Sequence, residues 1–239
     1  MYFKKTKPEI LLVGFGDLSA VEIDFKKAFA GHRVTSARTA SEGLAKIESD
    51  AVLIQPVYLL PGFEYERLCA EAAGCGKRTA VGKPLLFSEE SITAFARILL
   101  REYGQKPTFF AGHGSCHALG HAVYARLSDI LQTVGFPSAF VGVLEGQPDF
   151  DSAVKQIRQN GFSDITLAPL TLTAGKHVRE DIFGDIPNSF AGRLQASGFS
   201  VAPVHQTLLD LAAIRQMFVE ICRSALKDGE NFLYIRSCI

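Results

Sequence analysis

The sequence predicts an α/β fold of two similar Rossmann-like lobes, each built around a parallel sheet, with a cleft between the lobes. Strand and helix signals alternate along all 239 residues, and repeated β–α units favour parallel strands joined by right-handed crossovers. The pattern restarts near the middle, because the apolar run that ends in Gly14-Phe15-Gly16 resembles the run that ends in Gly112-His113-Gly114. Two further segments, 54–62 and 167–175, both meet a proline and then turn at a glycine. These repeats predict lobes 1–103 and 104–239, joined across 101–107.

In the first lobe, short apolar runs predict four strands, and apolar residues at helical spacing predict the helices between them. Ser88 is a favourable N-cap, and the segment after it repeats apolar residues on one face as far as Arg101. The predicted strands are 10–15, 33–36, 51–54 and 79–81, and the predicted helices are 19–30, 41–48, 62–73 and 88–101.

The second lobe repeats this order of strands and helices. Its predicted strands are 108–111, 139–144, 165–167 and 199–201, and its predicted helices are 118–134, 151–160, a helical region from 178 onward, and 208–226. We expect the last helix to cross back and pack on the first lobe. The tail 228–239 is apolar and receives no assignment.

Composition narrows the class of protein. Hydrophobic residues make up 47% of the chain and the formal net charge is zero, so a full core is expected and a nucleic-acid partner is not. The five cysteines are scattered without a CxxC pair, which is typical of reduced thiols in a cytosolic protein. The charged N-terminus and the absence of a long apolar segment predict neither a signal peptide nor a membrane span. We therefore expect a cytoplasmic location.

Three polar residues follow the strand signals of the second lobe at equal spacing. His113, Glu145 and His177 lie 32 residues apart, and each stands at or shortly after the end of a predicted strand. Ligands of open α/β sheets bind at the carboxyl ends of the strands, and two imidazoles with one carboxylate suit a divalent transition metal. Glycines on both sides of His113 are hard to explain by packing of that ring. The sequence therefore predicts metal chemistry in a cleft.

Neighbouring motifs carry weaker signals. His117 and His121 lie one helical turn apart, but no HExxH arrangement accompanies them, so His121 remains open between a ligand and a packing residue. Ser115 lacks a GxSxG context, which argues against a nucleophile. Gly14-Phe15-Gly16 lacks the third glycine of a dinucleotide loop, so a nucleotide-dependent oxidoreductase is disfavoured.

Together these segments resemble the anaerobic cobalt chelatases of cobalamin biosynthesis, which act on sirohydrochlorin and belong to the class II chelatases. The resemblance covers nearly the whole chain. It is most specific around Glu145 and His177, at 141–148 and 169–177, and extends to 10–16, 55–66 and 82–86. It implies two Rossmann-like, chelatase-type lobes without a bound nucleotide. It also implies that His113, Glu145 and His177 are the metal-binding and catalytic residues, with His113 as proton acceptor.

The resemblance implies an ATP-independent enzyme that inserts Co²⁺ into sirohydrochlorin. No tightly bound cofactor is expected, since the divalent metal (Co²⁺, or else Fe²⁺ or Ni²⁺) is a substrate. Lys83 and Lys176 are candidate partners for the carboxylates of the tetrapyrrole. The residues expected to contact the tetrapyrrole are Phe15, Tyr58, Leu59, Leu60, Lys83, Pro84, Leu85, Leu86, Ser115 and His117.

Two alternatives stay open at this point. A sirohydrochlorin or porphyrin ferrochelatase would use the same residues with Fe²⁺, and a carrier of the same fold would bind metal or tetrapyrrole without catalysis. The expected partners are therefore a tetrapyrrole and a divalent metal ion, with neither nucleic acid nor membrane. A homo-oligomer is compatible with the sequence.

Overall fold

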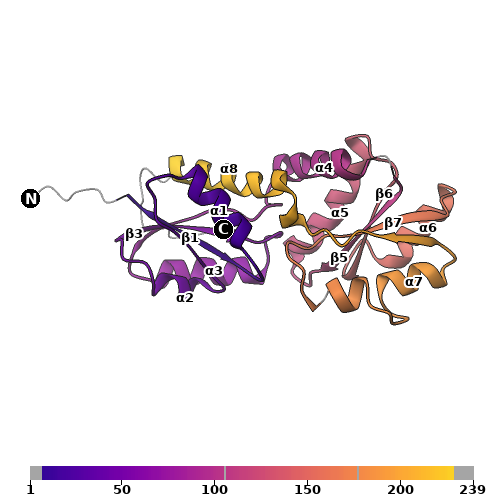
Figure 1. Ribbon diagram of the computed structural model, residues 1–239, viewed down its shortest axis with the longest axis horizontal. Helices are drawn as coiled ribbons and strands as arrows, with labels where there is room; N and C mark the ends of the chain where they lie inside the picture. Colours follow the sequence, from indigo (N-terminus) through magenta and orange to yellow (C-terminus); the bar gives the residue numbers. More distant parts are fainter. Residues whose placement is uncertain (1–6, 105, 177, 229–239) are drawn as a thin grey trace, which may run out of the picture. The chain divides into compact units, whose positions relative to one another are not determined.

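The computed structural model describes residues 7–104, 106–176 and 178–228. These residues form two compact units, one made of residues 7–87 with 212–228 and the other of Ser88–Leu211. Each unit holds a four-stranded parallel sheet flanked by helices (Figure 1). The predicted class, two similar Rossmann-like α/β lobes, is confirmed.

The first unit has the strand order β2-β1-β3-β4. The central strands β1 and β3 are buried at every position, as expected for parallel strands covered on both faces. Helices α1 and α8 cover one face, and α2 and α3 cover the other (Figure 1). In chain order the unit consists of β1 (Glu9–Gly14), α1 (Ser19–Ala28), β2 (Val34–Ala37), α2 (Ala40–Leu44), β3 (Ala51–Val57), α3 (Phe63–Gly74), β4 (Arg78–Val81) and α8 (Ala212–Asp228).

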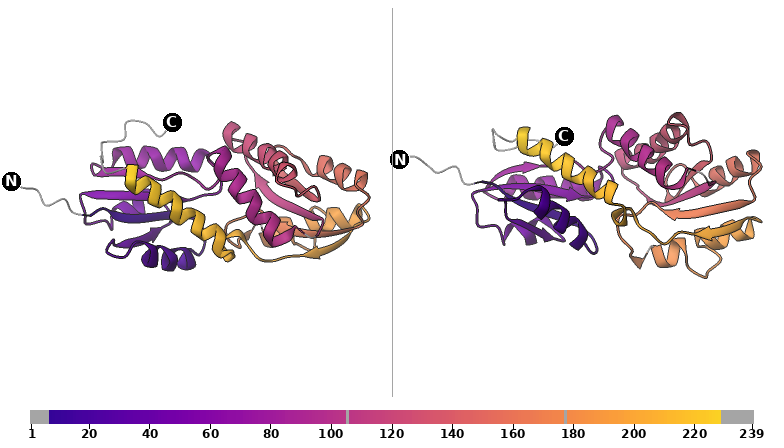
Figure 2. Two further views of the ribbon diagram at one scale, coloured as in Figure 1. Left: turned by 90° about the horizontal axis from the view of Figure 1, so that it is seen from above. Right: turned by 45° about the horizontal axis from the view of Figure 1, so that its top comes forward.

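Helix α8, from the end of the described chain, belongs to the first unit. Ile214, Phe218 and Cys222 recur every four residues and are fully buried, and the helix lies along α1 and over β3 (Figure 2). Arg215 Nε donates to Asp24 Oδ2 of α1 at 2.6 Å. The last helix therefore supplies part of the core that the first 87 residues need.

The second unit repeats the topology with the strand order β6-β5-β7-β8. Helices α4 and α5 lie on one face, and α6 and α7 lie on the other. In chain order the unit consists of α4 (Glu89–Tyr103), β5 (Thr108–Gly114), α5 (Ala118–Thr133), β6 (Ala139–Glu145), α6 (Phe150–Gln159), β7 (Asp164–Pro169), a π-helical turn η1 (Val178–Ile182), α7 (Phe190–Ala196), β8 (Ser200–Pro203) and a 3₁₀ turn η2 (Leu208–Asp210).

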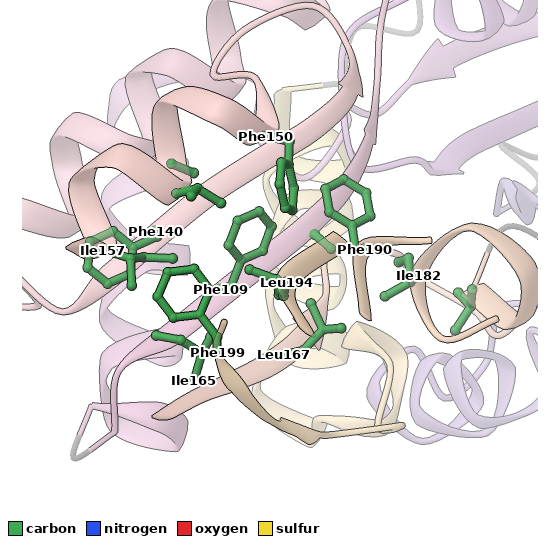
Figure 3. Packing of buried hydrophobic residues seen from close by; sticks show 14 residues of the cluster. Phe109, Phe140, Phe150, Ile157, Ile165, Leu167, Ile182, Phe190, Leu194 and Phe199 are labelled. Carbon is green, nitrogen blue, oxygen red and sulfur yellow. The ribbon is translucent and has the colours of Figure 1, made fainter. Parts of the chain in front are cut away.

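Aromatic side chains fill the core beneath α6 and α7. The ring centroid of Phe109 on β5 lies 5.7 Å from that of Phe150 and 5.5 Å from that of Phe190 (Figure 3). Contacts at these separations favour tilted ring pairs. Aliphatic residues from β7, α6 and α7 complete the cluster, among them Ile157, Leu167 and Leu194.

The boundary between the units differs from the expected position at 103/104. It lies between Phe87 and Ser88, because α4 packs on α5 through its apolar face and not on the sheet that precedes it. Glu89 of α4 also pairs with Arg126 of α5, whose Nε donates to Glu89 Oε2 at 2.8 Å. An apolar stripe reveals that a helix is buried, but not which sheet it covers.

Two helical predictions also change in detail. The region from Val178 begins as the short π-helical turn η1, and α7 starts only at Phe190. The predicted helix 208–226 is split, because Leu211 is extended between η2 and α8. The turn η2 is separately capped, since Asp210 Oδ2 accepts from the Thr207 N–H at 2.7 Å. Within the described ranges no helix is long and apolar enough to cross a membrane.

We predict that Phe218→Ala lowers the free energy of unfolding by about 3–5 kcal/mol, because it empties a fully buried ring site. Urea unfolding of the purified variant measures this loss. Gln216→Ala, on the exposed face of the same helix, is the control and should change stability by less than about 0.5 kcal/mol. Equal losses in the two variants would contradict the placement of α8 on the first unit.

Candidate metal and substrate site

His113 and Glu145 lie at neighbouring ends of two paired strands. Strands β5 and β6 run parallel with Gly114 in register with Glu145, and the Ser115 N–H donates to the Glu145 carbonyl oxygen at 3.1 Å. Both the His113 and Glu145 side chains are exposed. The edge where parallel strands end, called here the carboxyl edge, therefore carries an imidazole and a carboxylate on adjacent strands.

Strand β7 pairs with β5 on the side opposite β6. The chain leaves β7 at Pro169, and the Leu170 N–H donates to the Ala111 carbonyl oxygen at 2.7 Å. His177 lies outside the described residues, between Lys176 and the buried Val178 that opens η1. Among the described residues no three His, Cys, Asp or Glu side chains form a group that could hold a metal. The three-residue metal site therefore stays a prediction.

The glycines around His113 allow close packing of the backbone. A Cβ on Gly112 would lie 2.9 Å from Tyr124 Cε1, and a Cβ on Gly114 would lie 1.9 Å from the Glu145 carbonyl oxygen. Gly114 also has φ +91°, a left-handed conformation that favours glycine. These contacts account for both glycines, while His113 between them remains exposed.

Tyr124 of α5 packs against the end of β5. Its side chain is 3% exposed, and burial raises the pKa of its phenol to about 12, although a backbone hydrogen bond with Gly114 opposes the shift. The phenol is therefore neutral under physiological conditions. Tyr124 acts here as a packing residue for the segment that carries His113.

The turn after Glu145 leads into a well-capped helix. The Val143 N–H donates to the Pro148 carbonyl oxygen at 2.9 Å, and Asp149 Oδ1 accepts from the Ser152 N–H at 2.7 Å as the N-cap of α6. This backbone hydrogen bond lowers the pKa of Asp149 below its usual value, and the Gln147 side chain contributes further. The chain on both sides of Glu145 is thereby fixed by backbone contacts.

The serine and histidines that follow His113 have local structural roles. Ser115 Oγ accepts from the His117 N–H at 3.1 Å, and His117 is the N-cap residue of α5. His121 Nε2 accepts from the Gln147 N–H at 2.8 Å. The contacts of Ser115 are those of a turn residue, in line with the sequence argument against a nucleophile.

The carboxyl edge of the first unit carries aromatic residues close to lysine and arginine. Phe15, just after β1, is 42% exposed and stacks on Tyr58, just after β3, with ring centroids 5.8 Å apart. Burial raises the pKa of Tyr58 to about 12, so its phenol remains neutral. Lys83, after β4, places its ammonium 4.5 Å from the ring centroid of Phe87. Flat apolar surface and cations thus occur together at this edge.

A cavity of about 610 Å³ opens beside Phe15, between the ends of β1 and β2. The Arg38 guanidinium lies 5.8 Å from the Phe15 ring centroid, and no carboxylate of the described residues forms an ion pair with it. Two acidic side chains also line the cavity, and both are engaged locally. Glu22 accepts from Lys26 and from Ser36 Oγ, and Asp17 Oδ1 accepts from the Ser19 N–H at 2.9 Å. The cation of this cavity therefore has the capacity to bind an added anion.

A family model described as cobalt chelatase (CbiK) matches residues 21–227. The chain belongs to this family. The resemblance inferred from its motifs is confirmed. The chain is 31% identical over 182 residues to the sirohydrochlorin cobaltochelatase of Salmonella typhimurium, covering 73% of this chain and 68% of that protein. It is also 31% identical over 163 residues to the sirohydrochlorin cobaltochelatase CbiKC of Nitratidesulfovibrio vulgaris, covering 64% of this chain and 57% of that one.

Solved structures agree with the fold of this chain. SirB from Bacillus subtilis with Fe³⁺ superposes with a TM-score of 0.65 at 15% identity, over 94% of this chain and 98% of that chain. The sirohydrochlorin chelatase SirB from Bacillus subtilis subspecies spizizenii, in complex with cobalt, gives 0.58 at 16% identity, over 94% and 97%. At these identities the similarity concerns the fold alone.

Not every residue predicted to contact the substrate is accessible. Leu85 and Leu86 are 0% exposed and Pro84 is buried, so the expectation that these three contact substrate does not match their burial. The Leu85 N–H donates to the Tyr58 carbonyl oxygen at 2.9 Å, which turns the segment inward. Leu59 and Leu60 remain half-buried at the carboxyl edge.

The sequence analysis did not predict three residues at the carboxyl edge of the first unit. Arg38 follows β2 directly, but the predicted strand 33–36 stopped short of it. Phe63 and Phe87 are 59% and 37% exposed and lie beside the predicted contact residues. Arg38 could have been found from the sequence, because it comes directly after a parallel strand.

We predict that Gly114→Ala destabilises the protein more than Gly135→Ala does. Both glycines have nearly the same positive φ, +91° and +92°, so both variants lose about 1–2 kcal/mol from backbone strain. Only Gly114 would bring its Cβ against backbone, since nothing lies within 4 Å of a Cβ at Gly135. We expect urea unfolding to give a loss at least about 1 kcal/mol larger for Gly114→Ala. Equal losses would show that the β5–β6 approach is looser than described.

Proposed function

We propose that this chain inserts Co²⁺ into sirohydrochlorin, with His113, Glu145 and His177 as metal-binding and catalytic residues. The observation that supports this most directly is the β5–β6 register, which sets Glu145 beside the strand end that carries His113. The family match and the names of the two curated relatives give the reaction.

The chemistry of insertion fits these residue types. Two pyrrole protons must leave the macrocycle, and the metal must exchange its water shell for four pyrrole nitrogens. A neutral imidazole, with a reference pKa of about 6.5, accepts a proton and binds a divalent metal near neutral pH. A carboxylate beside it binds the metal or stabilises the imidazolium.

Incomplete coordination is essential to this mechanism. Two imidazoles and one carboxylate leave coordination positions open, whereas a closed four-ligand set retains its metal. Co²⁺ is then a substrate that passes through the site, and no tightly bound cofactor is required. His113, which lies on the central strand β5, is the proposed proton acceptor.

The carboxyl edge of the first unit suits the other substrate. Sirohydrochlorin is a flat macrocycle with carboxylate side chains, so it needs apolar ring contacts and cationic partners. Phe15 offers an exposed ring that stacks on the buried Tyr58, while Arg38 and Lys83 offer cations close to the exposed Phe15 and Phe87. We assign the tetrapyrrole body to the aromatic residues and its carboxylates to these cations.

We predict that His113→Ala, Glu145→Ala and His177→Ala each lower the rate of Co²⁺ insertion into sirohydrochlorin, His113→Ala by about 10²–10⁴-fold through loss of the proton acceptor. The absorbance change of the macrocycle on metal insertion measures the rate. His32→Ala is the control, because His32 contacts the Pro8 carbonyl oxygen at 2.8 Å in the first unit and has no proposed role. Wild-type activity in all three variants would contradict the assignment.

Running the same assay with Fe²⁺ and Ni²⁺ identifies the preferred metal.

We predict that Arg38→Ala raises KM for sirohydrochlorin about tenfold, the loss expected for one charge-assisted hydrogen bond of about 1.5 kcal/mol. The value of kcat should change little, since Arg38 has no part in proton or metal transfer. Arg67→Ala removes a 70% exposed arginine of the same unit and serves as the control. An unchanged KM in Arg38→Ala would remove this residue from the substrate site.

A further inference from the structure

Helix α5 contacts the ends of both strands that carry the proposed metal residues. Tyr124 packs against Gly112 of β5, where a Cβ would lie 2.9 Å from its ring. His121, one turn earlier on the helix, contacts the turn that follows β6. Residues three apart share a helix face, so one face of α5 reaches the His113 segment and the Glu145 turn together.

The direction of the His121 hydrogen bond shows whether its ring can also bind a metal. The Gln147 backbone N–H donates to His121 Nε2 at 2.8 Å, so this nitrogen uses its lone pair as a hydrogen-bond acceptor. The same lone pair is then not available to coordinate a metal ion. In this arrangement His121 is an anchor for the turn and not a metal ligand.

Packing of the ring adds to the hydrogen bond. Gly146 has φ +102°, and a Cβ there would lie 3.2 Å from His121 Cδ2 and 3.4 Å from the Ser115 carbonyl oxygen. The imidazole therefore lies directly against the backbone of Gly146. On its N-terminal side the turn is held by the Ser115 N–H, which donates to the Glu145 carbonyl oxygen at 3.1 Å.

The Glu145 side chain depends on this backbone for its direction. It is exposed at the carboxyl edge, and within the described ranges no hydrogen bond or ion pair restrains its carboxylate. Its orientation is set by the backbone on either side. The peptide unit after Glu145 is held through its carbonyl oxygen by the Ser115 N–H, and the next unit, which carries the Gln147 N–H, is fixed by His121. Groups that orient a metal ligand typically change metal affinity or activity by about 10–100-fold when they are removed.

We propose that His121 is a positioning residue, which holds the 145–147 turn so that the Glu145 carboxylate is presented to the metal. This inference rests on the proposed function, in which Glu145 handles Co²⁺. It also assigns His121, which the sequence left open between ligand and packing residue, to a third role.

The test compares two replacements of His121. His121→Phe keeps a ring but removes the acceptor, and we expect kcat for Co²⁺ insertion and the affinity for Co²⁺ each to fall about tenfold. KM for sirohydrochlorin should stay within a factor of about two, because the His121 ring contacts Gly146 and Gln147, to which no tetrapyrrole contact is assigned. His121→Gln places an amide oxygen near the position of Nε2 and should recover most of the loss. His32→Phe is the matched control for loss of an imidazole elsewhere.

A double-mutant cycle separates positioning from general destabilisation. If His121 acts through Glu145, adding His121→Phe to Glu145→Ala should cause no further loss of activity or Co²⁺ affinity, since coupled residues are non-additive. Additive losses, or a His121→Gln variant no better than His121→Phe, would overturn the proposal. Thermal melting of each variant establishes that it is folded.

Failure of this inference is distinguishable from failure of the proposed function. If Glu145→Ala retains full activity, the metal site itself is wrong, and with it the positioning role. If Glu145→Ala is impaired and His121→Phe behaves as wild type, only the role of His121 is refuted.

Discussion

The candidate site depends on the close approach of two backbones, where Gly114 at the end of β5 lies in register with Glu145 at the end of β6. A side chain at Gly114 would collide with the Glu145 carbonyl oxygen, and the left-handed φ of this residue adds a second requirement for glycine. Because the strands remain paired to their last residues, His113 and Glu145 are carried on neighbouring strand ends by the sheet itself. The contacts of Ser115, Tyr124 and His121 then stabilise an arrangement that this pairing creates.

The two units share one topology but carry different residues at their strand ends. Both sheets have the same strand order when each is numbered from its own first strand. The position between two glycines after the central strand is Phe15 in the first unit and His113 in the second. An exposed aromatic ring at that place suits a flat apolar ligand, whereas an exposed imidazole suits a metal or a proton. The strand ends determine where a ligand binds, and the residue placed there determines which ligand.

Much of the fold could be predicted because its signals are local. Apolar runs located the eight strands, and the similar segments 10–16 and 108–114 revealed the duplication. The membership of α4 could not be read in this way, since its apolar stripe fits either sheet and only the contact with α5 decides between them. At the site, position after a strand pointed to His113 and Glu145, but it did not separate the half-buried Leu59 and Leu60 from the fully buried Leu85 and Leu86. The anchoring role of His121 was beyond sequence reasoning, because its partner is a backbone N–H 26 residues away.

The position of α8 has a consequence for how the chain acquires its structure during synthesis. Phe218 and its neighbours fill the core of the first unit, yet they leave the ribosome only after the whole of Ser88–Leu211 has been made. At roughly 5–20 residues per second, the nascent first sheet waits on the order of ten seconds for its last helix. During that interval β3 lacks the cover that α8 provides, so the first unit completes its core only after the second unit has been made.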